Sequence, residues 1–245
     1  MRRGPIGLAW LPSAFVGMLA CGGGVTTTGP ITTAAASVHV VNAVTGSPSM
    51  SVYLNTAQTI PGLSFAQGYP DLTGTYASFP VQAQLQIGLP SLLLRSMLEW
   101  TAGTKTTLAL IGDVTNGVTV RVLSDTAVAP STGGFIRLLN AINYLGSSPI
   151  AGDSIDVYAY AAGSARPGAP TVRLAWGARS AYLPFAAGSI TIDTYDAGGN
   201  PAVAPLFSMS MTLATRDVRT VVARDPPQSS PSGTPGNYIV MAEQP

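Results

Sequence analysis

The chain has 245 residues, of which 9% are charged, and its formal net charge is +1. So low a positive charge excludes a basic surface for nucleic acid phosphates, and a single cysteine excludes a disulfide within the chain. The fold must therefore depend on its hydrophobic core, which a chain with 46% hydrophobic residues can supply.

Residues 1–20 have the pattern of a bacterial lipoprotein signal peptide. Arg2 and Arg3 precede a mostly apolar stretch at 6–20, which is short for a membrane span because such a helix needs about 20 apolar residues. The residues before Cys21 resemble a lipobox, so we expect Cys21 to carry fatty acyl chains such as palmitate. By the same resemblance, Gly22 would allow transfer to the outer membrane. A plain signal peptide with a chance cysteine and a buried free thiol are the alternatives.

Composition separates the rest of the chain into a tether and two modules. Residues 21–36 are rich in glycine, threonine and alanine without periodicity, which predicts a flexible tether. Clusters of proline, glycine and serine at 129–134 and 225–236 predict a boundary and a long loop. We therefore expect a first module at 37–130 and a second at 134–245.

The two modules are similar in sequence. Residues 37–43 match 135–141, and residues 51–54 match 156–159. Alternating apolar residues predict about seven strands in each module. Residues 91–100 have helix propensity, but their repeat partner at 205–213 alternates, so both are expected to be strands. The sequence thus predicts an all-β fold, with two tandem immunoglobulin-like β-sandwich modules after the signal peptide and tether.

The repeated motifs also carry a family resemblance. The first module has Val38-x-Val40-x-Asn42-Ala43 followed by Val52-Tyr53, and the second echoes it with Asn140-Ala141 and Val157-Tyr158. Together these motifs resemble the bacterial domain-of-unknown-function family 4397, in two copies over residues 36–242. The resemblance implies exported or cell-surface β-sandwich modules. It implies no established activity and no catalytic residues.

The residues offer little support for catalysis or metal binding. His39 is the single histidine and aligns with Arg137 in the repeat, so we expect both side chains to face solvent. One exposed histidine without a Gly-x-Ser-x-Gly motif argues against a serine hydrolase. One histidine and an acylated Cys21 cannot supply the three or four nitrogen or sulfur ligands of zinc. We expect no catalytic residue, no metal and no cofactor.

Two pairs of aspartates are the remaining candidates for chemistry. Asp153 lies near Asp156, and Asp193 lies near Asp196. A glycosidase needs two carboxyl groups at about 5–9 Å, and Asp153 with loop carbonyls could form a weak calcium site. Protection of strand edges and capping of turns explain the aspartates more simply. A hydrolase using paired aspartates is therefore the third hypothesis.

Aromatic side chains are the other candidate contacts. Tyr53 matches Tyr158 in the repeat and Tyr76 matches Tyr182, which favours packing roles for all four. Tyr160 and Tyr195 have no clear equivalent in the first module, and Trp176 is a further aromatic residue of the second. These three are the candidates for contact with a glycan or a peptide.

The sequence favours a non-enzymatic lipoprotein of the bacterial cell envelope, held by its lipid anchor and expected at the outer membrane. We expect a structural role or an interaction with a protein or glycan, and the sequence does not identify that partner. We expect no binding to nucleic acid. The alternative is a surface module that binds glycan or peptide. Specific binding that is lost on Trp176→Ala would favour that alternative.

Overall fold

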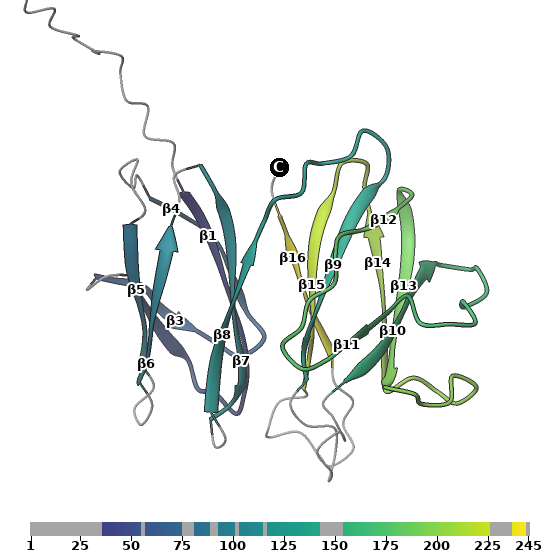
Figure 1. Ribbon diagram of the computed structural model, residues 1–245, viewed down its shortest axis with the longest axis horizontal. Coiled ribbons are helices and arrows are strands. Elements are labelled where there is room, and N and C mark those ends of the chain that lie inside the picture. Colours follow the sequence, from purple (N-terminus) through teal and green to yellow (C-terminus); the bar gives the residue numbers. More distant parts are fainter. Residues whose placement is uncertain are drawn as a thin grey trace, which may run out of the picture. The chain divides into compact units, whose positions relative to one another are not determined.

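The computed structural model describes residues 36–54, 57–74, 81–88, 93–100, 103–114, 117–142, 154–225 and 237–243. Within these residues the chain forms sixteen β-strands and no helix, which confirms the all-β prediction. All sixteen strands belong to one compact unit, Thr33–Pro245. The strands make four sheets of four strands each (Figure 1).

The first eight strands form two of the sheets. The inner strands of the first sheet, in the order β4-β1-β7-β8, pair in parallel, and the second sheet has the order β3-β2-β5-β6. The strands are β1 Ala36–Thr45, β2 Met50–Leu54, β3 Ala57–Leu63, β4 Gly68–Gly74, β5 Val81–Gly88, β6 Leu93–Trp100, β7 Lys105–Asp113 and β8 Gly117–Ser124. We call these two sheets the first sandwich.

The last eight strands repeat this arrangement. Their sheets have the orders β12-β9-β15-β16 and β11-β10-β13-β14, and β9 pairs with β15 in parallel. The strands are β9 Gly134–Ala141, β10 Ile155–Ala161, β11 Val172–Leu174, β12 Leu183–Phe185, β13 Gly188–Asp196, β14 Phe207–Leu213, β15 Val218–Arg224 and β16 Asn237–Ala242. Adding eight to each strand number of the first sandwich gives the strand order of this second sandwich.

Each sandwich has its own apolar core between its two sheets. Val38, Val40 and Leu108 of the first sandwich are fully buried against Val52 and Ile60 of the opposite sheet. The core of the second sandwich is built from the equivalent strands β9, β15, β10 and β13. Alternation along each strand places these residues on one face, as the periodicity predicts.

A third apolar cluster joins the sandwiches through the other faces of the two parallel-paired sheets. It contains Val41, Ala43, Ala109, Ile111 and Leu123 from the first sandwich, with Leu139, Ala141, Val222, Ile239 and Met241 from the second. The two sheets that contribute to this cluster are therefore covered on both faces. We call this cluster the interlayer.

The interlayer explains why the prediction for His39 and Arg137 was wrong. Both were expected to face solvent, but His39 is only 7% exposed and Arg137 is fully buried. Each residue does point away from the core of its own sandwich, as alternation predicts. That face is covered by the other sandwich, which no pattern within one module can reveal.

The prediction of strands at 91–100 and 205–213 is confirmed. Leu93–Trp100 is β6 and Phe207–Leu213 is β14, and each lies at the edge of its sheet. The repeat relation decided this question correctly against helix propensity, because equivalent strands occupy equivalent edges.

Candidate functional site

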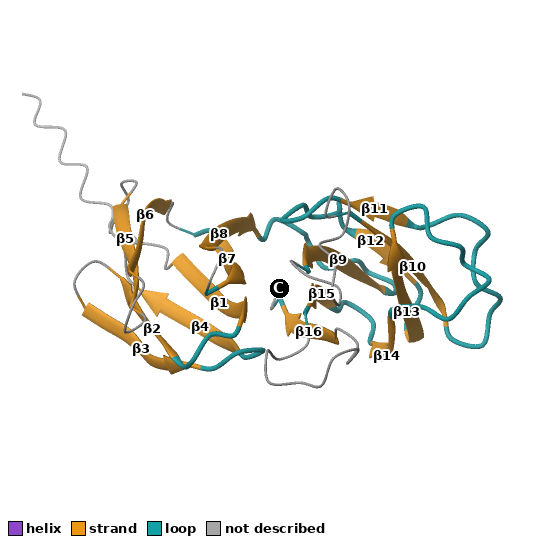
Figure 2. Ribbon diagram, turned by 90° about the horizontal axis from the view of Figure 1, so that it is seen from below, coloured by secondary structure: helices purple, strands orange, loops and turns teal. Residues whose placement is uncertain are grey.

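The second sandwich has two loops that are much longer than their equivalents in the first. Ten residues, 162–171, connect β10 to β11, whereas two residues connect β2 to β3. Another ten, 197–206, connect β13 to β14, against four between β5 and β6. Both long loops adjoin the sheet that contains β10 and β13 (Figure 2). Loops on a rigid scaffold are common places for function, so these loops define the candidate site.

Arg166 holds the two loops together. Its guanidinium, carried by the first loop, donates hydrogen bonds to the hydroxyl of Tyr195 and to the backbone carbonyl of Pro201 in the second loop. The same guanidinium lies 5.5 Å from the ring centre of Tyr158 and 5.1 Å from that of Tyr195. The two rings meet edge to face, with centres 5.4 Å apart. Arg166 is thus fixed by two cation–π contacts and two hydrogen bonds.

Carboxylates complete the cluster beneath the loops. Tyr160 donates a hydrogen bond of 2.8 Å to Asp193, which also lies 4.0 Å from the Arg166 guanidinium. Asp156 accepts two hydrogen bonds from Arg173, at 2.6 and 2.7 Å, and a third from the backbone amide of Gly198. Asp156 thus ties the second loop to β10.

The titration behaviour of these groups follows from the same contacts. The hydrogen bond from Arg173 lowers the pKa of Asp156 below its ordinary value, although burial opposes this shift. The hydrogen bond to Asp193 raises the pKa of Tyr160, because an ionised Tyr160 would lose that bond and face a carboxylate. Both groups are therefore held in their ordinary charge states at neutral pH, Asp156 as a carboxylate and Tyr160 as a neutral phenol.

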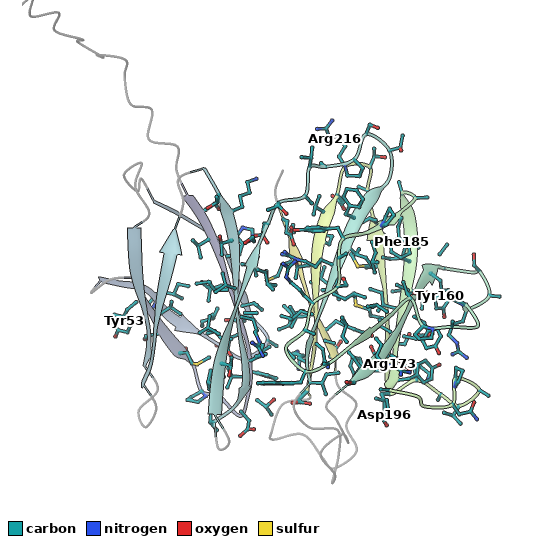
Figure 3. The ribbon with its side chains drawn as sticks, viewed as in Figure 1. Tyr53, Tyr160, Arg173, Phe185, Asp196 and Arg216 are labelled. Carbon is teal, nitrogen blue, oxygen red and sulfur yellow. The ribbon has the colours of Figure 1, made fainter. Side chains whose placement is uncertain are left out.

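The structure places the three predicted contact residues differently. Tyr160 is half-buried, while Tyr195 is only 3% exposed and lies under Arg166. Trp176 follows β11 and packs against the interlayer, with the Arg121 guanidinium 5.6 Å from its ring centre. The structure therefore brings Tyr160 and Tyr195 together through Asp193 and Arg166, and it places Trp176 apart from them. Figure 3 labels Tyr160 with Arg173 and Asp196.

The four repeat-matched tyrosines are only partly described. Tyr158 is 3% exposed, Tyr53 is half-buried (Figure 3), and Tyr182 donates a hydrogen bond of 2.7 Å to Glu243. Tyr76 lies outside the described residues. Burial and the bond to Glu243 raise the pKa of Tyr182. These positions fit the packing role that the repeat predicts.

Arg166 is not among the contact residues that the sequence predicts. One signal was available: the second module is longer than the first between the strands that match β2 and β3. Comparing the lengths of the two repeats would have marked residues 162–171 as an insertion. The partners of Arg166 lie in β10, β13 and the β13–β14 loop, so its role depends on tertiary structure.

A second polar cluster joins the two sandwiches at Arg137. Its fully buried guanidinium donates to Asp125, to the backbone carbonyl of Ser124 at 3.0 Å and to Glu243 at 2.6 Å. The Thr220 hydroxyl accepts from Arg137 at 2.9 Å and donates to Glu243. Both carboxylate side chains are only 4% exposed. This Arg137 network thus connects β8, β9, β15 and the residue that follows β16.

An open hollow of about 690 Å³ lies beside the Arg137 network. Asp125 and Glu243 are the carboxylates in its lining, and both already pair with Arg137. Lys105 and Arg216 contribute positive charge. Because its carboxylates are engaged elsewhere, the hollow does not present a free pair of carboxyl groups for acid–base catalysis.

The described residues give little support to the predicted calcium site or to a hydrolase with paired aspartates. Asp153, the candidate calcium ligand, lies outside them. Asp156 is paired with Arg173, and Asp196 is exposed at the end of β13. No three histidine, cysteine or acidic residues gather as a metal site in the described part of the chain. Nor do the described residues include a helix long and apolar enough to span a membrane.

Replacing Arg166 should loosen both long loops. In Arg166→Ala, amide hydrogen exchange in residues 162–171 and 197–203 is expected to accelerate by about tenfold, since two cation–π contacts and two charged hydrogen bonds are lost. Exchange in β10 and β13 should stay unchanged. Arg179→Ala removes an exposed arginine and serves as the control. Equal acceleration in both variants, or none in Arg166→Ala, would contradict this role.

Comparison with known proteins gives one family. Residues 36–151 match the model of a family described as a domain of unknown function, DUF4397. The match covers the whole of the first sandwich and extends through β9. None of the curated proteins matches the sequence.

Proposed function

We propose that this protein is a lipid-anchored, non-enzymatic component of a bacterial cell envelope, in which two DUF4397 modules form one compact unit with a structural or interaction role. The family match covers residues 36–151, and the second sandwich repeats the strand order of the first. This repetition supports a second copy of the module. Cys21 would carry the anchor, which we place at the outer membrane; it lies outside the described residues.

The observation that carries the proposal is that the polar side chains of both clusters satisfy one another. Arg166 is bound by Tyr195, Pro201 and two aromatic rings, and Asp156 is bound by Arg173. A catalytic site needs groups aimed at a substrate position, with a base within reach of its proton. Here the charged groups are used to hold loops and sandwiches in place. Such use favours a scaffold that presents loops to a partner.

The aromatic residues give less support to the glycan-binding alternative. Sugar stacking needs an exposed ring face, but Tyr195 is buried under Arg166 and Trp176 lies against the interlayer. Tyr160 uses its hydroxyl on Asp193. The exposed parts of the site are the two long loops, whose surface residues are mostly small. A protein partner suits that surface better than a sugar.

The anchor is tested by Cys21→Ala in the full chain. In a bacterial host grown with an alkyne-bearing fatty acid, the unsubstituted protein should incorporate the label and sediment with membranes, because two or more acyl chains give stable anchoring. Cys21→Ala should lose the label and leave the membrane fraction. Met18→Leu, which keeps Cys21, is the matched control and should be labelled like the unsubstituted chain. A Cys21→Ala protein that stays in membranes with its acyl mass would overturn the anchor.

A further inference from the structure

The free edges of the four sheets differ in how they are protected. Among the strands that the structure describes, eight lie at sheet edges, and six of these contain a proline or a charged residue, features that block pairing with another chain. These residues are Pro61 in β3, Pro70 and Asp71 in β4, Arg95 and Glu99 in β6, Arg121 in β8, Arg173 in β11 and Pro184 in β12. Only β14 and β16 among these edges have neither.

Within the described residues, the backbone groups at the outer edge of β14 have no partner strand. Ala162 donates its amide to the carbonyl of Ser189, which shows that the odd-numbered residues of β13 bond toward β10. The even-numbered residues of β13 therefore bond toward β14, where their partners are Phe207, Met209 and Met211. It follows that Ser208, Ser210 and Thr212 direct their amides and carbonyls away from β13. Within the described residues no further strand pairs there.

The sequence of β14 is self-complementary about Ser210. Phe-Ser-Met-Ser-Met-Thr-Leu has the same pattern in both directions: a large apolar residue at each end, hydroxyl residues inside these, then methionines around the central serine. An antiparallel copy centred on Ser210 would oppose serine to serine, methionine to methionine and Phe207 to Leu213. β16 lacks this symmetry, because a copy centred on Val240 would oppose Tyr238 to Ala242.

Burial along β14 also fits an additional strand. Phe207 and Leu213 at its ends are buried in the core of the second sandwich, but Met209 and Met211 between them are half-buried. The hydroxyl residues on the other face are exposed. A neighbouring strand would cover the methionines, while the exposed hydroxyls could pair across the new junction.

We propose that β14 is a self-association edge, at which a second copy of this chain adds its own β14 antiparallel about a two-fold axis through Ser210. Ser210 pairs with Ser210 of the second copy, and Ser208 pairs with Thr212 on each side. Each pair exchanges two backbone hydrogen bonds. No charge opposes a like charge, because the strand has none. The two sheets become one continuous eight-stranded sheet across the two copies.

This inference names a partner for the proposed interaction role, but it does not depend on the anchor. Directly opposed residues of a hydrogen-bonded pair have Cα atoms about 5.5 Å apart, which lies within the range of roughly 4.4–6.8 Å found for disulfides. The full-length Ser210→Cys chain, oxidised in intact cells of a bacterial host, should give about tenfold more disulfide-linked dimer than a matched control on a non-reducing gel.

The control is Thr191→Cys. Thr191 is the partner of Ser210 on β13, so in the proposed dimer two such residues lie three strand spacings, about 14 Å, apart. They cannot form a disulfide there. The unsubstituted chain, which keeps Cys21, measures the background.

Each outcome bears on the proposal. Dimer from Ser210→Cys alone supports the edge. Equal dimer from both variants means random collision, and background levels from both mean no pairing; either result overturns the proposal. A cross-link to a different protein also overturns it, since the edge would then belong to another partner. Failure here leaves the labelling of Cys21 untouched, so the two proposals fail separately.

A second variant tests the edge without new thiols. Ser210→Lys places two ammonium groups opposite each other across the two-fold axis, and Ser210 is exposed in the isolated chain, so folding is unaffected. Sedimentation of the detergent-solubilised full chain should show the dimer for the unsubstituted protein and loss of it for Ser210→Lys. Ser189→Lys, exposed on the neighbouring strand, should keep the dimer. Persistence of the dimer in Ser210→Lys would contradict the pairing.

Discussion

Arg137→Met is expected to lower the free energy of unfolding by about 3–5 kcal/mol. The side chain is fully buried and pairs with Asp125 and Glu243, each only 4% exposed. Removing the guanidinium leaves two buried carboxylates without a cation, and the carbonyl of Ser124 loses its donor. Methionine keeps most of the packing that the methylene groups of arginine supply. The main cost is therefore the burial of carboxylates that no longer have a cation. Denaturant unfolding of the variant and the unsubstituted protein measures the difference.

Two further variants separate charge from other effects of Arg137. Arg219→Met removes another β-strand arginine that pairs with an aspartate, but the Arg219 and Asp217 side chains are 30% and 23% exposed. Its effect should be within about 1 kcal/mol. Adding Asp125→Asn and Glu243→Gln to Arg137→Met removes the uncompensated charges, so part of the stability should return. If the triple variant is no more stable than Arg137→Met, the loss does not come from buried charge.

Ala109→Asp should separate the unfolding of the two sandwiches. Ala109 is fully buried in the interlayer, on the face of β7 turned away from the first core. Arg121 lies opposite Ala109 on β8, but its guanidinium stacks on the Trp176 ring. The new carboxylate must still be desolvated among the apolar side chains of the cluster, so we expect a loss of about 2 kcal/mol or more. Because the cores of both sandwiches are unchanged, each can stay folded alone. The single cooperative transition expected of the joined sandwiches should divide into two, as differential scanning calorimetry would detect.

The control for Ala109→Asp is Val122→Asp. Val122 lies on the adjacent strand β8 but is 49% exposed, so its replacement should change stability by less than about 0.5 kcal/mol and leave one transition. A single transition in Ala109→Asp, with ordinary cooperativity and little loss of stability, would show that the interlayer does not couple the sandwiches.

Patterns within the chain predicted the strands better than they predicted which faces are covered. Alternation of apolar residues placed Val38 and Val40 in the first core, and the repeat identified β6 as a strand. The same alternation turned His39 and Arg137 outward correctly, yet both are buried. Period-2 patterning reports which residues share a face, and it does not report what lies against that face. Contact between two sheets of different modules is therefore invisible to it.

The candidate site was predictable only in part, for a related reason. Tyr160 and Tyr195 were selected because they lack equivalents in the first module, and both do lie in the cluster held by Arg166. Trp176 was grouped with them as an aromatic residue, although it belongs with Arg121 beside the interlayer. Residue type alone made the three aromatic residues a single set. Which side chains become neighbours is decided by the register between paired strands. Asp156 meets Tyr195 across the β10–β13 pair, a relation that only the register supplies.

The parallel pairing inside each sandwich has a consequence for the order in which the chain can fold. In the first sandwich Ser37 pairs with Lys105, and in the second Phe135 pairs with Val218. The opening strand of each module therefore has no partner for one of its edges until most of that module has been made. Such long-range closure is slow compared with hairpin formation. Each sandwich therefore stays incomplete until its seventh strand has been synthesised, so its folding is expected to follow synthesis rather than accompany it.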